Sequence, residues 1–180
     1  MPIPTFLTER LQLRPFAPAD AALVQALAGA PEVAATALTI PHPYPDGAAE
    51  TWIARHMTDA DDGIRLTWAI VRRRDETLLG AITLGLAGRH GRGSLGYWLG
   101  VPYWNQGYTT EAARRVTAFA FLECGCYRVE AGCFPRNVAS SRVMEKSGLR
   151  YEGVLRSYLR KGDHFEDVAM YALLRPEFTG

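Results

Sequence analysis

The chain has 180 residues, of which 48% are hydrophobic and 22% are charged, the composition of an ordinary soluble domain. Its 20 Lys and Arg residues against 19 Asp and Glu leave a formal net charge of +1, without the basic excess typical of nucleic-acid-binding proteins. No apolar run approaches the roughly 20 residues that span a bilayer, and the first residues lack the pattern of a secretory signal. We therefore expect a single cytoplasmic domain over residues 1–180, with neither nucleic acid nor membrane as a partner.

The three cysteines give no sign of a disulfide framework or of a metal site. An odd number of cysteines in a chain of this length argues against systematic disulfide pairing. Cys124 and Cys126 are separated by one residue, which is not the CxxC spacing of redox and zinc sites. We expect Cys124, Cys126 and Cys133 to be reduced thiols and expect no bound metal.

Hydrophobic periodicity and breaker residues divide the chain into strands and helices. Apolar and polar residues alternate over Arg10–Arg14, as in a half-buried strand. Pro18 opens an alanine-rich helix, and Gly29 with Pro31 ends it. The charged turn Arg73–Glu76 joins two strands of a hairpin. The expected elements are a strand at 10–14, helices at 18–29 and 47–58, strands at 66–71, 78–86 and 94–99, a helix at 109–123, a strand at 127–134, a helix at 137–147, and strands at 150–159 and 166–174.

This order of elements predicts an α/β fold in which helices cover the faces of one mixed sheet. A GxGxxG string at Gly91–Gly96 is not a dinucleotide site, because a strand follows it where that fingerprint requires a helix. A glycine-rich hairpin turn accounts for the string. Three prolines keep residues 39–46 out of regular structure.

The segment Gly96–Ala112 reads as a buried strand, a tight polar loop and the first turn of a helix. The first N–H groups of a helix have no intrahelical partner, and the helix dipole adds partial positive charge there. Such a junction favours a phosphate or a pyrophosphate. A strand edge leading into it suits a long, amide-bearing ligand such as coenzyme A. The ordinary alternative is a plain strand-to-helix connection in which Gly107 serves only the turn.

A second polar segment, Asn137–Leu149, follows the strand that ends near Phe134. Asn137 has an ordinary interpretation as a helix N-cap, and Ser140 has one as a polar residue of the first turn. The two segments together, in this order, are far less expected by chance than either one alone.

Both segments resemble the acetyl-CoA-binding motifs of the GNAT N-acetyltransferases, and in particular those of the RimJ/RimL-like ribosomal-protein branch. That branch carries a "GYWL…YWxxGYxTEA" string and an "NxxSxRVxEKxGF" string. The chain matches them at Gly96–Leu99, Tyr103–Trp104, Gly107–Tyr108, Thr110–Ala112 and Asn137–Leu149, and it resembles the branch also at Thr8–Phe16 and Gly162–Leu174.

The resemblance implies the GNAT fold, a mostly antiparallel sheet flanked by helices, with acetyl-CoA lying where strand 94–99 splays from strand 127–134. Pantetheine would pair with backbone near Trp98 and Leu99, Asn137 would hold the cofactor arm, and Ser140 would lie near the thioester sulfur. The pyrophosphate would rest on the amides of the loop residues Gln106, Gly107, Tyr108, Thr109 and Thr110.

The implied reaction is direct transfer of the acetyl group to a primary amine, either a protein N-terminus, such as a ribosomal one, or a small molecule. A backbone N–H near Leu99 would stabilise the oxyanion, a contact worth roughly 3 to 4 kcal/mol in other enzymes. Ser140 is the candidate general acid. Relatives often pair, so a homodimer is a further expectation.

The chain departs from common GNAT patterns at two positions. Met144 stands where many members carry a tyrosine acid, and Ser94 stands where many carry a strand carboxylate. No general base is therefore named. The weak candidates are His42, His90, Glu130 and Glu166, each of which also has an ordinary surface role, and a water chain would suffice. The alternatives are an acyl-CoA-binding module without turnover and a transferase for another acyl-CoA such as succinyl-CoA.

Overall fold

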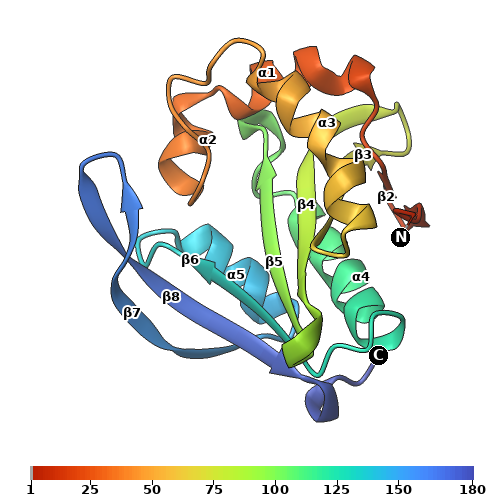
Figure 1. The fold of residues 1–180 in the computed structure, drawn as a ribbon, viewed down its shortest axis with the longest axis vertical. Helices are drawn as coiled ribbons and strands as arrows, with labels where there is room; N and C mark the ends of the chain where they lie inside the picture. The colour runs from red at the N-terminus through yellow and green to blue at the C-terminus, as the bar shows by residue number, and fades with distance from the viewer. Residues whose placement is uncertain (1) are drawn as a thin grey trace.

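One eight-stranded sheet runs through the computed structural model, which describes residues 2–180 (Figure 1). The strand order is β1-β2-β3-β4-β5-β6-β8-β7, and every neighbouring pair is antiparallel except β5 and β6. The strands are β1 (Phe6–Leu7), β2 (Leu11–Arg14), β3 (Arg65–Arg72), β4 (Thr77–Ala87), β5 (Arg92–Leu99), β6 (Arg128–Cys133), β7 (Arg150–Lys161) and β8 (His164–Leu174).

Helices cover both faces of this sheet. In Figure 1, α1 and α3 lie in front of the strands, and α4 and α5 lie behind them. The α-helices are α1 (Ala21–Ala28), α2 (Pro31–Thr36), α3 (Ala48–Asp61), α4 (Tyr108–Leu122) and α5 (Val138–Lys146). Short 3-10 helices stand at Pro18–Asp20, Gly88–His90, Val101–Tyr103 and Arg175–Glu177.

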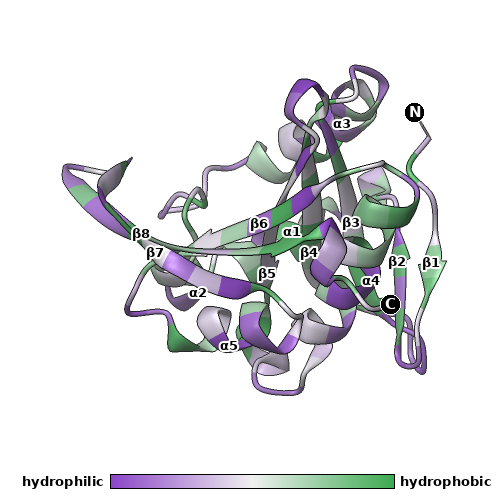
Figure 2. Cartoon of the chain, turned by 90° about the horizontal axis from the view of Figure 1, so that it is seen from below, coloured by the Kyte–Doolittle hydropathy of each residue, from purple (hydrophilic) through white to green (hydrophobic). Residues whose placement is uncertain are grey.

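Strand β3 shows why the sheet has a core on each face. Successive side chains of a strand point to opposite faces. Trp68 and Ile70 accordingly lie in the larger core with α4, while Ala69 and Val71 lie in the smaller core with α1 and α3. A strand buried on both faces is apolar along most of its length, which explains the largely hydrophobic run of β3. Its buried polar side chain, Thr67, lies with its hydroxyl 3.2 Å from that of Thr83. Figure 2 shows hydrophobic residues gathered along the strands and hydrophilic ones at the turns.

The expected order of strands and helices is confirmed, with boundaries that shift by a few residues, and two elements were missed. Pro31 was interpreted as a helix stop, but it is the first residue of α2. Proline has no backbone N–H and a fixed φ, so the same residue can end one helix and begin the next. The second missed element is β1, a two-residue strand that pairs with β2.

Strands β5 and β6 pair over only four residues and then diverge. Arg92–Leu95 pairs in parallel with Arg128–Ala131. Beyond that, Gly96–Leu99 continues along β4, while Gly132–Cys133 continues along β8. We call the region between Gly96–Leu99 and Gly132–Cys133 the β5–β6 fork; its opening is visible in Figure 1.

Candidate active site

One backbone amide of the predicted site points from the open edge of β5 toward the β5–β6 fork. The N–H of Gly100 donates to the carbonyl of Leu79 on β4 over 2.9 Å. Backbone groups of successive strand residues point to opposite edges, so the N–H of Leu99 faces the fork and that of Trp98 faces β4. The indole Nε1 of Trp104 donates to the Leu99 carbonyl over 2.8 Å. Leu99 therefore offers a backbone donor toward the fork, and Trp98 does not.

The loop before α4 has the geometry expected of an anion site. Asn105 and Gly107 both adopt positive φ angles, of 60° and 79°. Gly107 is the N-cap and supplies no side-chain cap, and the first backbone bond of the helix runs from Glu111 N–H to the Gly107 carbonyl. The amides of the first helical residues, Tyr108–Thr110, precede that bond and so have no intrahelical acceptor. Partial positive charge collects at such an end.

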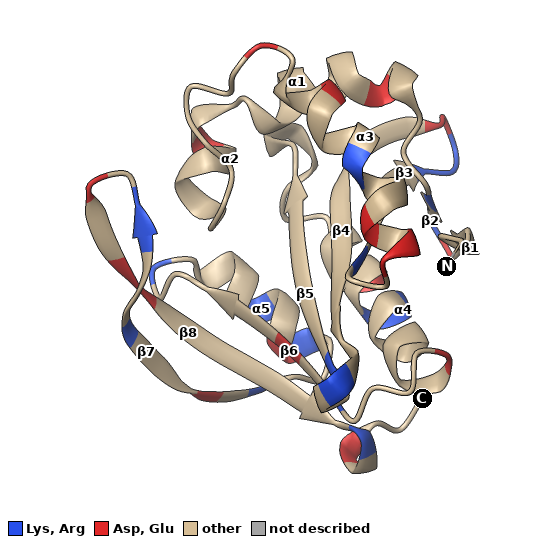
Figure 3. Cartoon of the chain, viewed as in Figure 1, with Lys and Arg blue, Asp and Glu red and all other residues tan. Residues whose placement is uncertain are grey.

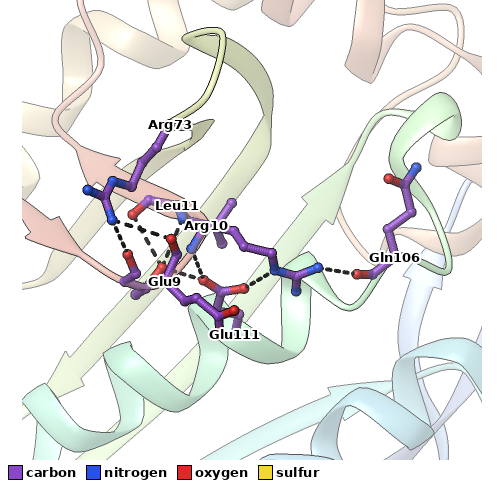
Figure 4. A network of polar contacts seen from close by, with 7 residues as sticks. Glu9, Arg10, Leu11, Arg73, Gln106 and Glu111 are labelled. Carbon is purple, nitrogen blue, oxygen red and sulfur yellow. Dashed lines mark hydrogen bonds and ion pairs between the residues drawn. The ribbon is translucent and has the colours of Figure 1, made fainter.

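A network from the start of the chain holds this loop in place (Figure 4). Arg10 lies between α4 and the loop, where its Nε donates to Glu111 over 2.7 Å and its Nη1 donates to the Gln106 carbonyl over 2.9 Å. The other oxygen of Glu111 accepts bonds from the Thr8 hydroxyl and the Arg10 N–H. Burial opposes the ionisation of Glu111, but these hydrogen bonds outweigh it and hold its pKa below the usual value. Glu111 thus neutralises the charge of Arg10. The effect of Arg10 on the loop is to hold it in position through the hydrogen bond to the Gln106 carbonyl.

Asn137 joins two helices across the fork. Its Oδ1 accepts a bond from the Ser140 N–H over 3.1 Å, which is the N-cap of α5. Its Nδ2 donates to the Thr36 carbonyl over 3.2 Å at the end of α2. The structural interpretation of Asn137 as a cap is confirmed, and Asn137 follows the end of β6 at Cys133.

Ser140 lies in hydrogen-bond contact with Tyr97, which was not among the predicted site residues. The hydroxyl oxygen of Tyr97 on β5 lies 2.9 Å from Ser140 Oγ and 3.2 Å from the Ser140 carbonyl oxygen. Burial holds the pKa of the Tyr97 phenol above its usual range, so this hydroxyl stays protonated. The signal available in the sequence was alternation, since Tyr97 shares a strand face with Leu95 and Leu99, which are buried in the core. As Figure 3 shows, β5 carries no Lys, Arg, Asp or Glu along this part of the strand.

Cys133 ends β6 close to the same place. Its Sγ lies 3.4 Å from Ser141 Oγ, and burial raises the pKa of its thiol. All three cysteines are free thiols, as expected, with Cys124 partly exposed and Cys126 and Cys133 buried.

Met144 and Ser94, the two departures from common GNAT patterns, both lie away from the open part of the fork. Met144 is 2% exposed and belongs to the core under α5. Ser94 lies on the paired segment of β5, opposite Gly85 on β4 and beside Glu130 on β6. Neither residue reaches the open part of the fork.

The four weak base candidates are placed as follows. His42 and His90 are exposed. Glu130 accepts a bond from Arg128 Nε over 2.7 Å. Glu166 pairs with Arg136, before α5, in a two-point ion pair of 2.6 and 2.9 Å. The Arg136 guanidinium holds the pKa of Glu166 below its usual value, which makes this carboxylate a weaker base.

The tryptophans pack in or against the two cores. Trp68 is fully buried, and its Nε1 donates to the Pro4 carbonyl over 2.7 Å. Trp104 packs on the larger core, while Trp52 and Trp98 pack on the smaller one, with their ring centroids 6.5 Å apart.

Within residues 2–180, no helix has the length and apolar character needed to cross a membrane. Over the same residues, His, Cys, Asp and Glu side chains form no group of three arranged to hold a metal ion.

Comparison with known proteins places the chain in a family. A family model described as an acetyltransferase (GNAT) domain matches residues 10–150. YoaA of Bacillus subtilis, described as an uncharacterized N-acetyltransferase, is 35% identical over 115 residues, which are 63% of this chain and 64% of YoaA, just under two thirds of that protein. The uncharacterized N-acetyltransferase p20 of Bacillus licheniformis is 27% identical over 178 residues, covering 98% of this chain and 99% of p20.

A solved structure agrees in fold. RimJ of Mycobacterium smegmatis, in complex with CoA-disulfide, superposes with a TM-score of 0.84 at 24% identity, over 94% of this chain and 84% of RimJ. The mostly antiparallel sheet, flanked by helices and opened at the β5–β6 fork, is the architecture that the resemblance implied. The family model covers more than half of the chain, and on this ground the chain belongs to the GNAT acetyltransferase family.

Proposed function

We propose that this protein is an N-acetyltransferase that moves the acetyl group of acetyl-CoA to a primary amine. The observation that carries the proposal is the fork itself: β5 and β6 part after four paired residues, and an uncapped helix start and the cap of α5 stand beside the opening. RimJ, which shares the fold, was solved with CoA-disulfide. We further propose that residues 1–180 act as one cytoplasmic domain.

The residues present fit coenzyme A. The free amides of Tyr108–Thr110 suit a pyrophosphate, because they combine unpaired donors with the positive end of the α4 dipole. Gln106 and Gly107 shape the loop in front of them, and Arg10 fixes it. The open edge of β5 along Gly96–Leu99 suits the amides of a pantetheine arm, and Asn137 follows β6 on the opposite side of the fork. We propose no metal.

Three steps fall to the protein in the transfer. The Leu99 N–H stabilises the negative charge that develops on the acetyl oxygen. Ser140 passes a proton to the departing sulfur. The amine must also lose a proton, and because an N-terminal amine has a pKa of about 8, water reaching the fork suffices as a base near neutral pH.

We propose that the acceptor amine enters at the open end of the fork, which α2 and the β7–β8 hairpin flank in Figure 1. Both a protein N-terminus and a small molecule fit this proposal. The hairpin also bears exposed apolar side chains, among them Tyr151, Tyr158 and Phe165 at 56%, 59% and 66% exposure. Exposed apolar residues on an edge strand are typical of an interface, so we propose a homodimer through β7. Light scattering across a concentration series tests this.

Isothermal titration with acetyl-CoA, CoA and succinyl-CoA tests the cofactor. We expect micromolar binding that prefers the acetyl form, followed by thiol release when amines and N-terminal peptides are added. Preference for succinyl-CoA would reassign the donor. No binding to any of the three would refute the proposal.

A second candidate, an acyl-CoA-binding module without turnover, is favoured by one observation. The position of the common tyrosine acid is occupied by Met144, which is buried and has no proton to give. This candidate predicts the same binding with no thiol release across the amine panel, so the two functions separate at the second step of the same experiment.

A further inference from the structure

Two hydroxyl groups from distant parts of the chain meet at the β5–β6 fork. Tyr97 on β5 and Ser140 in the first turn of α5 are 43 positions apart in sequence, and their hydroxyl oxygens are 2.9 Å apart. The Asn137 side chain holds the backbone N–H of Ser140 at the same time. Ser140 is therefore fixed at its backbone by α5 and at its side chain by β5.

Each hydroxyl has one proton, so the pair admits two arrangements. In the first, Tyr97 donates to Ser140 Oγ, and the Ser140 proton is left to point away from Tyr97. In the second, Tyr97 donates to the Ser140 carbonyl, which lies 3.2 Å away, and Ser140 donates back to Tyr97. The hydroxyl pair is in contact in both arrangements, so its distance alone does not decide between them. The first arrangement gives the Tyr97 proton to the nearer acceptor, Ser140 Oγ, and a phenol is a stronger hydrogen-bond donor than an aliphatic alcohol. On these two grounds the first arrangement is favoured.

We propose that Tyr97 is a positioning residue for acetyl transfer: its hydroxyl donates to Ser140 Oγ and directs the Ser140 proton into the fork, toward the sulfur that leaves. This inference rests on the proposed function. It also assigns a task to a tyrosine in a chain that has methionine at the common tyrosine position.

The proton balance of the step is complete. A C–N bond forms and the C–S bond breaks, and one proton must travel from the amine nitrogen to the sulfur. Ser140 gives its proton to the sulfur and takes one from the nitrogen, directly or through water, so that its hydroxyl is restored. Tyr97 keeps its own proton throughout.

Burial explains why Tyr97 orients and does not itself supply the proton. The pKa of its phenol lies above the usual range because a phenolate is poorly solvated at this position. A group that stays protonated is a constant donor to Ser140 Oγ. It stabilises that oxygen while the Ser140 proton moves.

Steady-state kinetics with Tyr97→Phe, Ser140→Ala and the double variant test the proposal. We expect Tyr97→Phe to lower kcat roughly tenfold with the KM for acetyl-CoA unchanged, the size of effect that one hydrogen bond supplies. In the Ser140→Ala background the same change should have no further effect. Tyr127→Phe is the control, because it removes a phenol hydroxyl from a 59% exposed tyrosine at the closed end of β6.

A second measurement needs no acceptor. The ultraviolet absorbance of the thiolate, followed against pH, gives the pKa of CoA bound to each variant. A Ser140 proton aimed at the sulfur lowers this pKa in the wild type, and Tyr97→Phe should bring it back toward the value of free CoA.

The outcomes separate the two proposals. Absence of CoA binding by the wild-type protein contradicts the proposed function. Wild-type binding with an unchanged thiol pKa and unchanged kcat in Tyr97→Phe overturns the role of Tyr97 alone. A faster Tyr97→Phe enzyme would show the second arrangement, in which Tyr97 holds the Ser140 proton back.

Discussion

His56 is a titratable side chain that is buried among aromatic rings. It is 5% exposed, and among residues 2–180 neither of its ring nitrogens has a hydrogen-bond partner. Its ring packs 4.4 Å from the Trp52 ring and 5.3 Å from the Phe16 ring, centroid to centroid. Burial among aromatic rings lowers the pKa of His56 from 6.5 to about 4, so the folded protein holds it neutral.

We predict that His56 makes the folded state sensitive to mild acid. Its pKa is lower in the folded than in the unfolded protein, so the unfolded chain binds more protons between pH 6.5 and about 4. The free energy of unfolding is unaffected by His56 above this window. It falls as the pH is lowered through the window, by on the order of 3 kcal/mol. Urea unfolding of wild-type and His56→Leu proteins at pH 7 and pH 4.5 checks this. An equal loss in both proteins would exclude His56 as the cause.

Ser140 carries the second residue-scale prediction. Ser140→Ala removes the hydroxyl proposed to serve the leaving sulfur but leaves the backbone N–H bonded to Asn137. We expect turnover to fall by about tenfold or more, with acetyl-CoA affinity largely kept. Thiol-release kinetics paired with calorimetry measure the two quantities. Unchanged turnover would remove Ser140 from the acid role.

At the scale of elements, the β1–β2 turn stabilises the start of α4. Arg10 and Glu111 are 101 positions apart in sequence, yet they form the ion pair that fixes the Gln106 carbonyl. The Arg10 guanidinium also lies 4.7 Å from the centroid of the Tyr108 ring. A carboxylate in the first turn of a helix interacts favourably with the helix dipole. In the structure, Glu111 also anchors the loop that presents the free amides.

We predict that Glu111→Gln weakens CoA binding about fivefold or more, without contact between Glu111 and the ligand. Loss of the charged partner frees Arg10 and lets the loop move, which removes preorganisation worth about 1 kcal/mol. Calorimetry with CoA measures the change. Glu123→Gln is the matched control, because Glu123 pairs with Arg115 over 3.7 Å at the far end of the same helix. Equal affinities for the two variants would show that the network does not act on the site.

At the scale of the whole molecule, α2 is tied to the other half of the sheet. Lys161, at the end of β7, donates to the carbonyls of Ala34 and Ala37, and Asn137 donates to the Thr36 carbonyl. Burial lowers the pKa of Lys161, but the ammonium still lies against the carbonyl end of a helix, where positive charge is stabilising. The short β5–β6 pairing would otherwise leave these two halves joined mainly at the closed end of the fork.

We predict that Lys161→Met loosens α2 and leaves the rest of the fold unchanged. The variant removes the donor to two carbonyls, so amide hydrogen exchange should accelerate at residues 32–36 of α2 and stay constant in β3 and β4. Arg160→Met is the control, since Arg160 is exposed and pairs only loosely with Asp163. Unchanged exchange in α2 would show that Asn137 and packing hold this helix without Lys161.

Most elements, their order and the family could be predicted from the sequence alone. Periodicity identified every strand from β2 to β8, because those signals arise from neighbours on one face of one element. Asn137 was recognisable as a cap since its partner, Ser140, lies three positions away. The same local reasoning failed at Pro31, where one residue serves two helices, and at β1, which is too short to show a period.

The contacts that join distant residues of the site arise from tertiary packing. Tyr97 with Ser140, Arg10 with Glu111, and Lys161 with Ala34 are separated by 43, 101 and 127 positions. Nothing in the local pattern of either partner predicts such a contact, because it depends on how β5 diverges from β6 and how α2 folds back over the sheet. Sequence reasoning therefore located the two halves of the site, and packing determined which hydroxyl faces Ser140 and which amide faces the fork.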